Sequence, residues 1–351
     1  MDKYAAELID KLDRTHALTE EEYLFLLDNR TADMAKELAR RAVAVRKRIY
    51  GNTVFIRGLI EISNICKNDC LYCGIRRSNR NCERYRLLPE EILDCAKHGY
   101  RLGFRTFVLQ GGEDPFFTDD VLCPLITQIK EACPGSAVTI SMGERGEDSF
   151  RRLRAAGADR YLLRHETADE VHYGKLHPPE MSFRNRMECL QALRRAGYQV
   201  GAGFMVGSPF QTNRELAKDL LFIGEFHPEM CGIGPFIPHR ETPFADCPPG
   251  TLELTCFLLS LIRLIRPPVL LPATTALGTI APDGREKGIL SGANVVMPNL
   301  SPGSVRKQYE LYDGKICTGE EAAECLGCLA RRMESVGYRI VTDRGDAAPY
   351  A

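Results

Sequence analysis

The chain has 351 residues, 44% of them hydrophobic, which is enough for one large α/β domain with its own core. Its 46 Lys and Arg residues nearly balance its 47 Asp and Glu residues. This balance argues against long-range attraction to nucleic acid or to an anionic membrane. We therefore expect a small or locally docked partner, and no nucleic acid.

The N-terminus does not resemble an export signal, since residues 1–16 are charged throughout and lack an apolar core. The most apolar stretch, residues 256–281, is interrupted by Arg263, Arg266, Pro267 and Pro268, which argues against a membrane span. We therefore expect a cytoplasmic protein. Its fourteen cysteines are then expected to be reduced thiols, some of them metal ligands.

Residues 1–52 are expected to form an N-terminal helical segment. Thr19 and Thr31 stand where helix N-caps are expected, and Glu22, three residues after Thr19, completes a capping-box pattern. Residues 32–48 end in the basic run ARRAVAVRKR, whose Ala and Val residues recur at helical spacing. That spacing favours a solvated helix face over a docking surface.

From residue 53 onward, short β-rich runs alternate with helical stretches. In LGFRTFVL, AGADRYLL and AGYQVGAG, a glycine ends a helix just before the next run. Eight such runs favour a closed parallel (β/α)8 barrel of the TIM type, residues 53–310, over an open doubly wound sheet. Residues 311–351 are expected to pack on the barrel as a C-terminal extension rather than form a domain. The expected strands are 53–60, 106–110, 137–142, 160–165, 199–206, 231–237, 270–275 and 293–298.

In such a barrel the carboxyl ends of the strands meet at one mouth, where the fold carries its chemistry. Polar residues follow several of the expected strands, so we expect them to line one pocket. They are Gln110 to Glu113, Ser141, Arg164 to Glu166, Gly203 to Gly207, and Thr274 with Thr275.

Three cysteines follow the first expected strand, in NICKNDCLYCG: Cys66, Cys70 and Cys73. Their spacing would also suit one buried helix face, but the polar residues between them favour a loop. A structural zinc site needs a fourth ligand, which Cys82 could supply. Fe–S cubanes also normally take four thiolates, so three thiolates leave one iron open to a reactant.

The CxxxCxxC spacing in a loop after the first strand of a βα barrel resembles the signature of the radical S-adenosylmethionine (SAM) superfamily. The resemblance implies a [4Fe-4S] cluster on the three cysteines, with the amine and carboxylate of SAM on the open iron. Reductive cleavage of SAM then yields methionine and a 5′-deoxyadenosyl radical. The cofactors supply this chemistry, and the protein is expected to orient them.

The same resemblance assigns roles to residues at successive strand ends. Tyr72 would lie beside the adenine, and Gly112 with Glu113 matches the GGE element, whose acid accepts a hydrogen bond from the methionine ammonium. Glu166 would hold the ribose hydroxyls, and Arg186 would bind the methionine carboxylate. Taken alone, each could be an ordinary surface or core residue. The expected cofactor contacts are Tyr72, Gly112, Glu113, Ser141, Arg164, Glu166, Arg186 and Tyr309.

Sequence blocks between about residues 55 and 317 narrow the resemblance. NICKNDCLYCGIRRSN, VLQGGEDP, GADRYLLRHET, GAGFMVGSPFQT and PATTALGTI are similar to the HydE family of FeFe-hydrogenase maturases. The likeness implies that the radical acts at sulfur in an iron-bound cysteine complex, Fe(CO)2(CN)(Cys), during assembly of the diiron subcluster of the H-cluster. It implies the maturases HydG and HydF as partners, with a flavodoxin or ferredoxin as reductant.

Buried arginine and threonine side chains would suit such an anionic substrate. Thr274 and Thr275 could also reflect strand propensity alone, and His165 could be a satisfied core imidazole. The residues expected in the substrate cavity or at its rim are Arg160, Arg164, His165, Thr274, Thr275 and Tyr309.

A second set of three cysteines, Cys317, Cys325 and Cys328, stands near the C-terminus. If they are free surface and core cysteines that bind no metal, they need no further explanation. The resemblance to HydE implies instead a second, peripheral Fe–S cluster, of the 2Fe-2S or 4Fe-4S type.

Arginines crowd residues 75–86, beside the first cysteine motif. A solvated loop is the simpler interpretation, and a docking patch for an acidic electron donor is the alternative. The arginines are Arg76, Arg77, Arg80, Arg84 and Arg86.

Two other classes of function stay open on the sequence alone. Methylornithine synthase and biotin synthase share the expected architecture, so the substrate could be a small amino acid or a sulfur compound. A zinc- or Fe–S-holding structural or binding protein would be inert to SAM, whereas a radical SAM enzyme would consume it under reduction.

Overall fold

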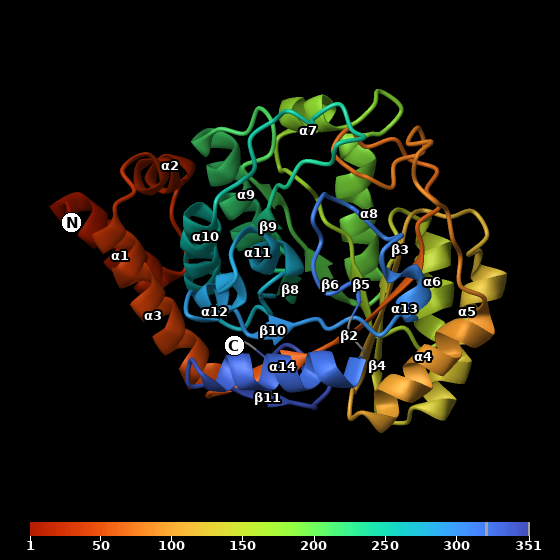
Figure 1. The fold of residues 1–351 in the computed structure, drawn as a ribbon. Coiled ribbons are helices and arrows are strands. Elements are labelled where there is room, and N and C mark those ends of the chain that lie inside the picture. Colours follow the sequence, from red (N-terminus) through yellow and green to blue (C-terminus); the bar gives the residue numbers. More distant parts are fainter. Residues whose placement is uncertain (320–321, 350–351) are drawn as a thin grey trace.

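The computed structural model describes residues 1–319 and 322–349, with the backbone alone for residues 322–325. Short parallel strands form the centre of the molecule, and helices surround them (Figure 1). None of the described helices is both long and apolar enough to cross a lipid bilayer.

Six parallel strands pair in chain order in one sheet. Three isolated parallel bridges and β10 (Val295–Val296) then complete the ring, so the predicted closed barrel is confirmed. The bridges join Met230 to Leu270, Pro272 to Val295, and Leu59 to Asn299. The six strands are β2 (Gly58–Ser63), β3 (Thr106–Gly111), β4 (Ala137–Ser141), β5 (Arg160–Leu162), β6 (Gln199–Ala202) and β8 (Met230–Cys231).

Glycines end three of the helices that lead into strands, as the sequence predicted. Gly103, Gly157 and Gly197 have φ values of 98°, 111° and 81°, which only glycine adopts readily. The helices around the barrel are α4 (Pro89–Arg101), α5 (Asp119–Ala132), α6 (Glu147–Ala155), α7 (Glu170–Leu176), α8 (Phe183–Arg195), α9 (Asn213–Phe226), α10 (Leu252–Ile265), α11 (Thr275–Ile280), α12 (Gly284–Ile289) and α13 (Gly303–Arg306).

Three N-terminal helices, α1 (Lys3–Thr15), α2 (Glu20–Asp28) and α3 (Ala32–Tyr50), cover one side of the barrel (Figure 1). Thr19 caps α2 in a reciprocal capping box with Glu22, and Thr31 caps α3, both as predicted. Helix α3 packs along α10, and α2 packs on α9.

The predicted strand 53–60 divides in two at Arg57. Its first half, β1 (Thr53–Ile56), pairs with β10 and with the C-terminal strand β11 (Arg339–Val341), whereas β2 pairs with β3. The strand therefore changes one neighbour midway, because the C-terminal segment supplies an extra strand beside its first half.

Several other predicted strands are shorter than expected. The run 199–206 contains β6 and β7 (Met205–Val206), and the run 231–237 contains β9 (Gly234–Pro235), which pairs with β7. The run 270–275 makes only bridges at Leu270 and Pro272, since Thr275 already begins α11.

The C-terminal segment covers the amino ends of the strands. After α14 (Ala322–Glu334) and β11, the backbone carbonyl of Arg344 accepts a hydrogen bond from Thr106, the first residue of β3. Asp346 accepts hydrogen bonds from Arg160, at the start of β5, and from Gln199, at the start of β6. The opposite, carboxyl ends of the strands hold the main cavity.

Candidate active site

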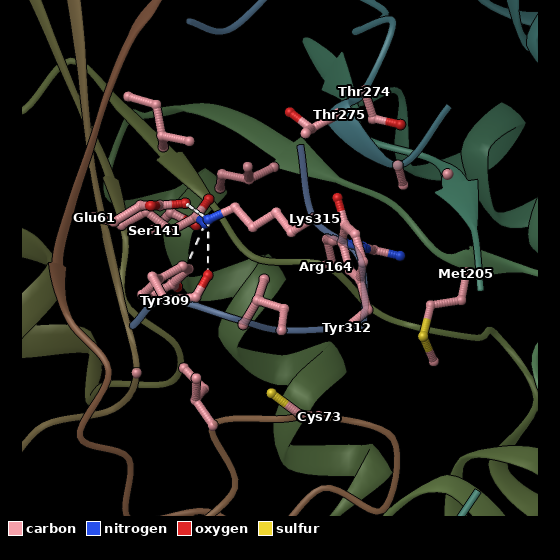
Figure 2. A pocket seen from close by; sticks show the side chains of 18 of the residues that line it. Glu61, Cys73, Ser141, Arg164, Met205, Thr274, Thr275, Tyr309, Tyr312 and Lys315 are labelled. Carbon is pink, nitrogen blue, oxygen red and sulfur yellow. Dashed lines mark hydrogen bonds and ion pairs between the residues drawn. The ribbon is translucent and has the colours of Figure 1, made fainter. Parts of the chain in front are cut away.

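A cavity of about 370 Å³ lies at the carboxyl ends of the barrel strands (Figure 2). Its wall includes all three cysteines of the first motif and polar side chains from β2, β3, β4 and the segments after β5 and α10. Residues 307–317, here called the mouth segment, contribute Tyr309, Tyr312, Lys315 and Cys317 to the wall. The predicted convergence of strand ends on one pocket is therefore found in the structure.

The loop that carries the three cysteines is held in place by its own polar residues. Asp69 accepts two hydrogen bonds from Arg76, at 2.8 and 2.7 Å, and two more from Ser78. The backbone N–H of Lys67 donates to the carbonyl of Glu113, and that of Gly74 donates to Leu311 in the mouth segment. These contacts fix the loop without using the cysteine sulfurs.

The three cysteine sulfurs are not spaced as the ligands of one zinc ion. Sulfurs around one tetrahedral zinc lie about 3.8 Å apart, since each Zn–S bond is about 2.3 Å. Those of Cys66, Cys70 and Cys73 do not all lie within 4.8 Å of one another. The alternative fourth ligand, Cys82, accepts a hydrogen bond from Asn64 and does not line the cavity.

Burial raises the pKa of the thiols in this motif, that of Cys73 to about 12. Without a metal the thiols would therefore stay protonated at neutral pH. A positively charged metal centre reverses this preference, because metal ligation requires the thiolate. Three thiols of one loop that face the same cavity are therefore a donor set that suits a metal cluster.

The GGE element lies directly against the cysteine loop. A side chain at Gly112 would stand 2.3 Å from the carbonyl oxygen of Ile65 and 2.8 Å from Cβ of Cys66. The backbone N–H of Glu113 donates to the sulfur of Cys66 over 3.3 Å. The Glu113 carboxylate accepts from the backbone N–H of Glu144 and pairs with Lys67 at 3.1 Å.

Beyond this element, Glu166, Arg164 and Arg186 line the same cavity. Glu166 holds a left-handed backbone, with φ of 66°, while its N–H donates to Gly203. Arg186 reaches from α8, where its Nε donates to Glu144 and its Nη1 to the carbonyl of Arg164. Arg164 Nη2 stands 3.3 Å from Glu166, and its buried Nε has no hydrogen-bond partner among the described residues. Such a donor is suited to a bound ligand.

Tyr72 is held by a buried histidine. Its hydroxyl lies 3.2 Å from Nε2 of His177, whose Nδ1 lies 2.9 Å from the carbonyl of Tyr173. A carbonyl only accepts, so Nδ1 carries the proton and Nε2 accepts from Tyr72. Burial lowers the pKa of His177 to about 3, which keeps this neutral form at physiological pH.

The other end of the cavity is rich in hydroxyl groups. Thr274 is the N-cap of α11 rather than a strand residue, and the hydroxyl of Thr275 accepts from Arg285 over 3.3 Å. The buried Tyr309 accepts from Gln110 over 3.4 Å, and Ser141 lines the wall at the end of β4. These predicted residues share one cavity (Figure 2).

Two predicted cavity residues lie elsewhere, and those predictions were wrong. Arg160 begins β5, so its side chain binds Thr106 and Asp346 at the opposite end of the barrel. His165 is fully buried behind the wall, where Nδ1 accepts from the N–H of Gly203 and Nε2 faces Asp219 at 3.2 Å. Burial lowers the pKa of His165 to about 3, so it is a core imidazole.

Comparison with known proteins identifies the family of this chain. Residues 60–223 match the radical SAM superfamily. The hydrogenase maturase subunit HydE of Thermotoga maritima is 44% identical over 339 residues, which are 97% of this chain and 96% of that protein. The chain belongs to the HydE family of radical SAM enzymes. Family membership implies a [4Fe-4S] cluster and SAM as cofactors.

More distant relatives share the architecture. The 3-methylornithine synthase of Methanosarcina barkeri is 29% identical over 94% of this chain and 92% of its own. A crystal structure of methylornithine synthase has a TM-score of 0.83 at 28% identity, covering 95% of this chain and 97% of its own. A structure of the maturase HydG has a TM-score of 0.80 at 23% identity, covering 97% and 76%, which supports the fold alone.

In this HydE-family chain, the second cysteine set is only partly described. Cys317 lies in the mouth segment, where it lines the cavity and its sulfur is 3.7 Å from Arg285. Cys328 is exposed on α14, whereas the side chain of Cys325 lies outside the described residues. Cys317 is therefore closer to the cavity than the predicted peripheral position implied.

The arginine-rich loop does not form the five-residue docking patch considered above. Arg76 binds Asp69, Arg86 binds Asp114, and Arg84 donates to four backbone carbonyls. Arg77 and Arg80 are the exposed members. Three of the five arginines therefore stabilise the loop of this HydE-family enzyme.

Sequence reasoning also missed several cavity residues. Glu61, in the middle of β2, and Lys315, in the mouth segment, form a buried ion pair in the wall. The others include Arg285 and Tyr312. Inward alternation along β2 could have indicated Glu61, but no periodic pattern marks Lys315.

Proposed function

We propose that this enzyme uses SAM-derived radical chemistry to assemble the diiron subcluster of FeFe hydrogenase, acting on a cysteine-bound Fe(CO)2(CN) complex. The main support is the 44% identity with a HydE that extends over nearly the whole of both chains. The cavity supports it as well, since three cysteines stand at one end and hydroxyl and cationic side chains at the other.

The residues present fit the cofactors that the family implies. Held by Cys66, Cys70 and Cys73, the cluster would supply the electron that cleaves SAM to methionine and a 5′-deoxyadenosyl radical. Arg186 and Glu166 would hold the carboxylate and ribose of SAM, and the buried Nε of Arg164 offers an unused donor nearby.

The rest of the wall suits a small anion rather than an extended chain. The hydroxyls of Thr274, Thr275 and Tyr309 would donate to it, and the apolar part of the wall would exclude water from the radical step. Arg164 and Arg285 would supply positive charge for a carboxylate or cyanide group.

We also propose that Cys317, Cys325 and Cys328 hold a second Fe–S cluster, as in the resemblance noted above. The support is the spacing of the three cysteines in the sequence, of which the structure describes the side chains of Cys317 and Cys328. HydG would deliver the substrate, HydF would receive the product, and a flavodoxin or ferredoxin would supply electrons.

A reconstituted maturation mixture tests this function. Apo-hydrogenase, HydG, HydF and reductant should yield active hydrogenase only when this protein and SAM are added. A methylornithine synthase would instead convert L-lysine to methylornithine and leave the hydrogenase inactive. That second outcome, or hydrogenase activation without this protein, would reject the proposed function.

A further inference from the structure

An ion pair inside the cavity connects two distant parts of the chain. Glu61 stands on β2, and Lys315 comes from the mouth segment, 254 residues later. Lys315 Nζ lies 2.5 Å from one Glu61 oxygen, and the side chains are 9% and 1% exposed. Figure 2 shows the lysine side chain reaching across the cavity to Glu61 and Tyr309.

The hydrogen bonds of this ion pair leave one N–H donor of Lys315 unused. The second Glu61 oxygen accepts from Asn299 over 2.8 Å, so both oxygens are used. An ammonium has three N–H donors, and Lys315 uses one for Glu61 and one for the carbonyl of Tyr309, at 2.8 Å. Its third N–H has no hydrogen-bond partner among the residues that the structure describes. The ammonium lies 4.8 Å from the centre of the Tyr309 ring, and Lys315 lines the cavity.

Anchoring the mouth segment does not by itself explain a buried charge. A buried ion pair contributes little net stability relative to apolar side chains of similar size. The mouth segment is also tied down independently, because Gly74 donates to Leu311 and Asn64 donates to Gln308. An unused donor on a buried cation instead suits an anionic ligand.

We propose that Lys315 binds the substrate of this enzyme through a carboxylate, with Glu61 holding the ammonium in place. This inference rests on the proposed function and assigns a binding residue to the carboxylate of its substrate. Lys315 would then determine specificity from the wall formed by β2 and the mouth segment. Thr274, Thr275 and Arg164 line other parts of the same cavity.

The test compares Lys315→Met with Lys315→Arg in the full-length, cluster-loaded enzyme. The probe is the synthetic complex Fe(CO)2(CN)(Cys), titrated into the maturation mixture. Lys315→Met should raise the KM for the complex about tenfold, as expected on loss of a charge-assisted hydrogen bond, and Lys315→Arg should reverse most of that rise. Iron content and SAM affinity should stay at wild-type values.

Lys130 offers a matched control at the other end of the barrel. Its ammonium also binds one carboxylate, Asp159, and one carbonyl, Ser136, but outside the cavity. Lys130→Met should leave the KM for the complex unchanged. If Lys315→Met does not fold, Glu61→Gln provides the same test, since it removes the partner that holds the ammonium.

Three results would overturn the role of Lys315. They are a KM rise of less than threefold, an equal rise in the Lys130 variant, or a parallel loss of SAM affinity, which would indicate a general effect on the mouth segment. Failure of the proposed function is distinguishable, because the wild-type enzyme itself would then not activate the hydrogenase.

Discussion

Gly112 has no room for a side chain, because an added Cβ would meet the backbone of the cysteine loop. Gly112→Ala should therefore displace Ile65 and Cys66 and lower both iron content and SAM cleavage severalfold. Gly174→Ala is the matched control, since it lies in α7 with nothing within 4 Å of the added Cβ. Iron per chain and 5′-deoxyadenosine yield measure the effect, and wild-type values for Gly112→Ala would show that the loop tolerates displacement.

Arg186 is buried at the cavity wall and already binds Glu144 and the carbonyl of Arg164. Arg186→Ala should weaken SAM binding by about 1.5 to 3 kcal/mol, the range for a lost charge-assisted hydrogen bond. Its neighbour Arg184 is exposed on the same helix, so Arg184→Ala should have no effect. Titration with SAM measures both, and unaltered affinity in the Arg186 variant would remove this residue from the SAM site.

His177 makes stability depend on pH in a defined window. Burial lowers its pKa to about 3, whereas an unfolded chain has a histidine pKa of about 6.5. Between these values only the unfolded chain takes up the proton, so stability is fully present above pH 6.5 and falls as the pH is lowered. Lowering the pH from 7.5 to 5.5 therefore reduces the free energy of unfolding by about 1.4 kcal/mol through this one group.

The variant His177→Gln cannot titrate in this window. Its free energy of unfolding should therefore fall by about 1.4 kcal/mol less than that of the wild type over the same pH change. Denaturant unfolding at the two pH values measures the difference. An identical fall in both proteins would mean that His177 is protonated in the folded state.

At the scale of elements, the mouth segment brings Cys317, one member of the second cysteine set, to the cavity wall. The variant with Cys317, Cys325 and Cys328 all changed to Ala should lose part of its iron and part of its visible absorbance. It should retain SAM cleavage and hydrogenase maturation, because the radical is formed at the first cysteine motif. Normal iron content would show that the second set binds no metal, and loss of maturation alone would assign it an essential role.

The end of β5 shows which site residues the sequence could predict. Arg164 and His165 are neighbours beyond the end of this strand, and only Arg164 lines the cavity, because His165 is fully buried behind the wall. The prediction that Arg160 lines the cavity was wrong for a different reason, because Arg160 begins its strand and lies at the amino end of the barrel. The sequence located β5 but could not fix where the strand ended.

Other elements were predictable because their signals are local. The capping box of Thr19 and the glycines after α4, α6 and α8 depend on residues a few positions apart. The pairing of β1 with β11 and the contact of Lys315 with Glu61 join residues more than 250 positions apart. Nothing in the local sequence pattern encodes such contacts.

At the scale of the whole molecule, the two ends of the barrel have different tasks. The C-terminal segment closes the amino ends of the strands through Asp346, Arg344 and their partners. The carboxyl ends hold the cavity, with the cysteines, the proposed SAM contacts and the mouth segment around it. The contacts at the amino ends of the strands thus stabilise the barrel, and the carboxyl ends carry the site of the reaction.

The central claim is that Cys66, Cys70 and Cys73 hold a cluster that cleaves SAM. Its most direct test is the yield of 5′-deoxyadenosine, measured by chromatography after anaerobic reconstitution and addition of dithionite and SAM. The wild type and Cys82→Ser should release 5′-deoxyadenosine, whereas Ala or Ser at any of the three positions should abolish it, since two thiolates cannot hold the open iron in place. Full yield from any one of those three variants would contradict the account.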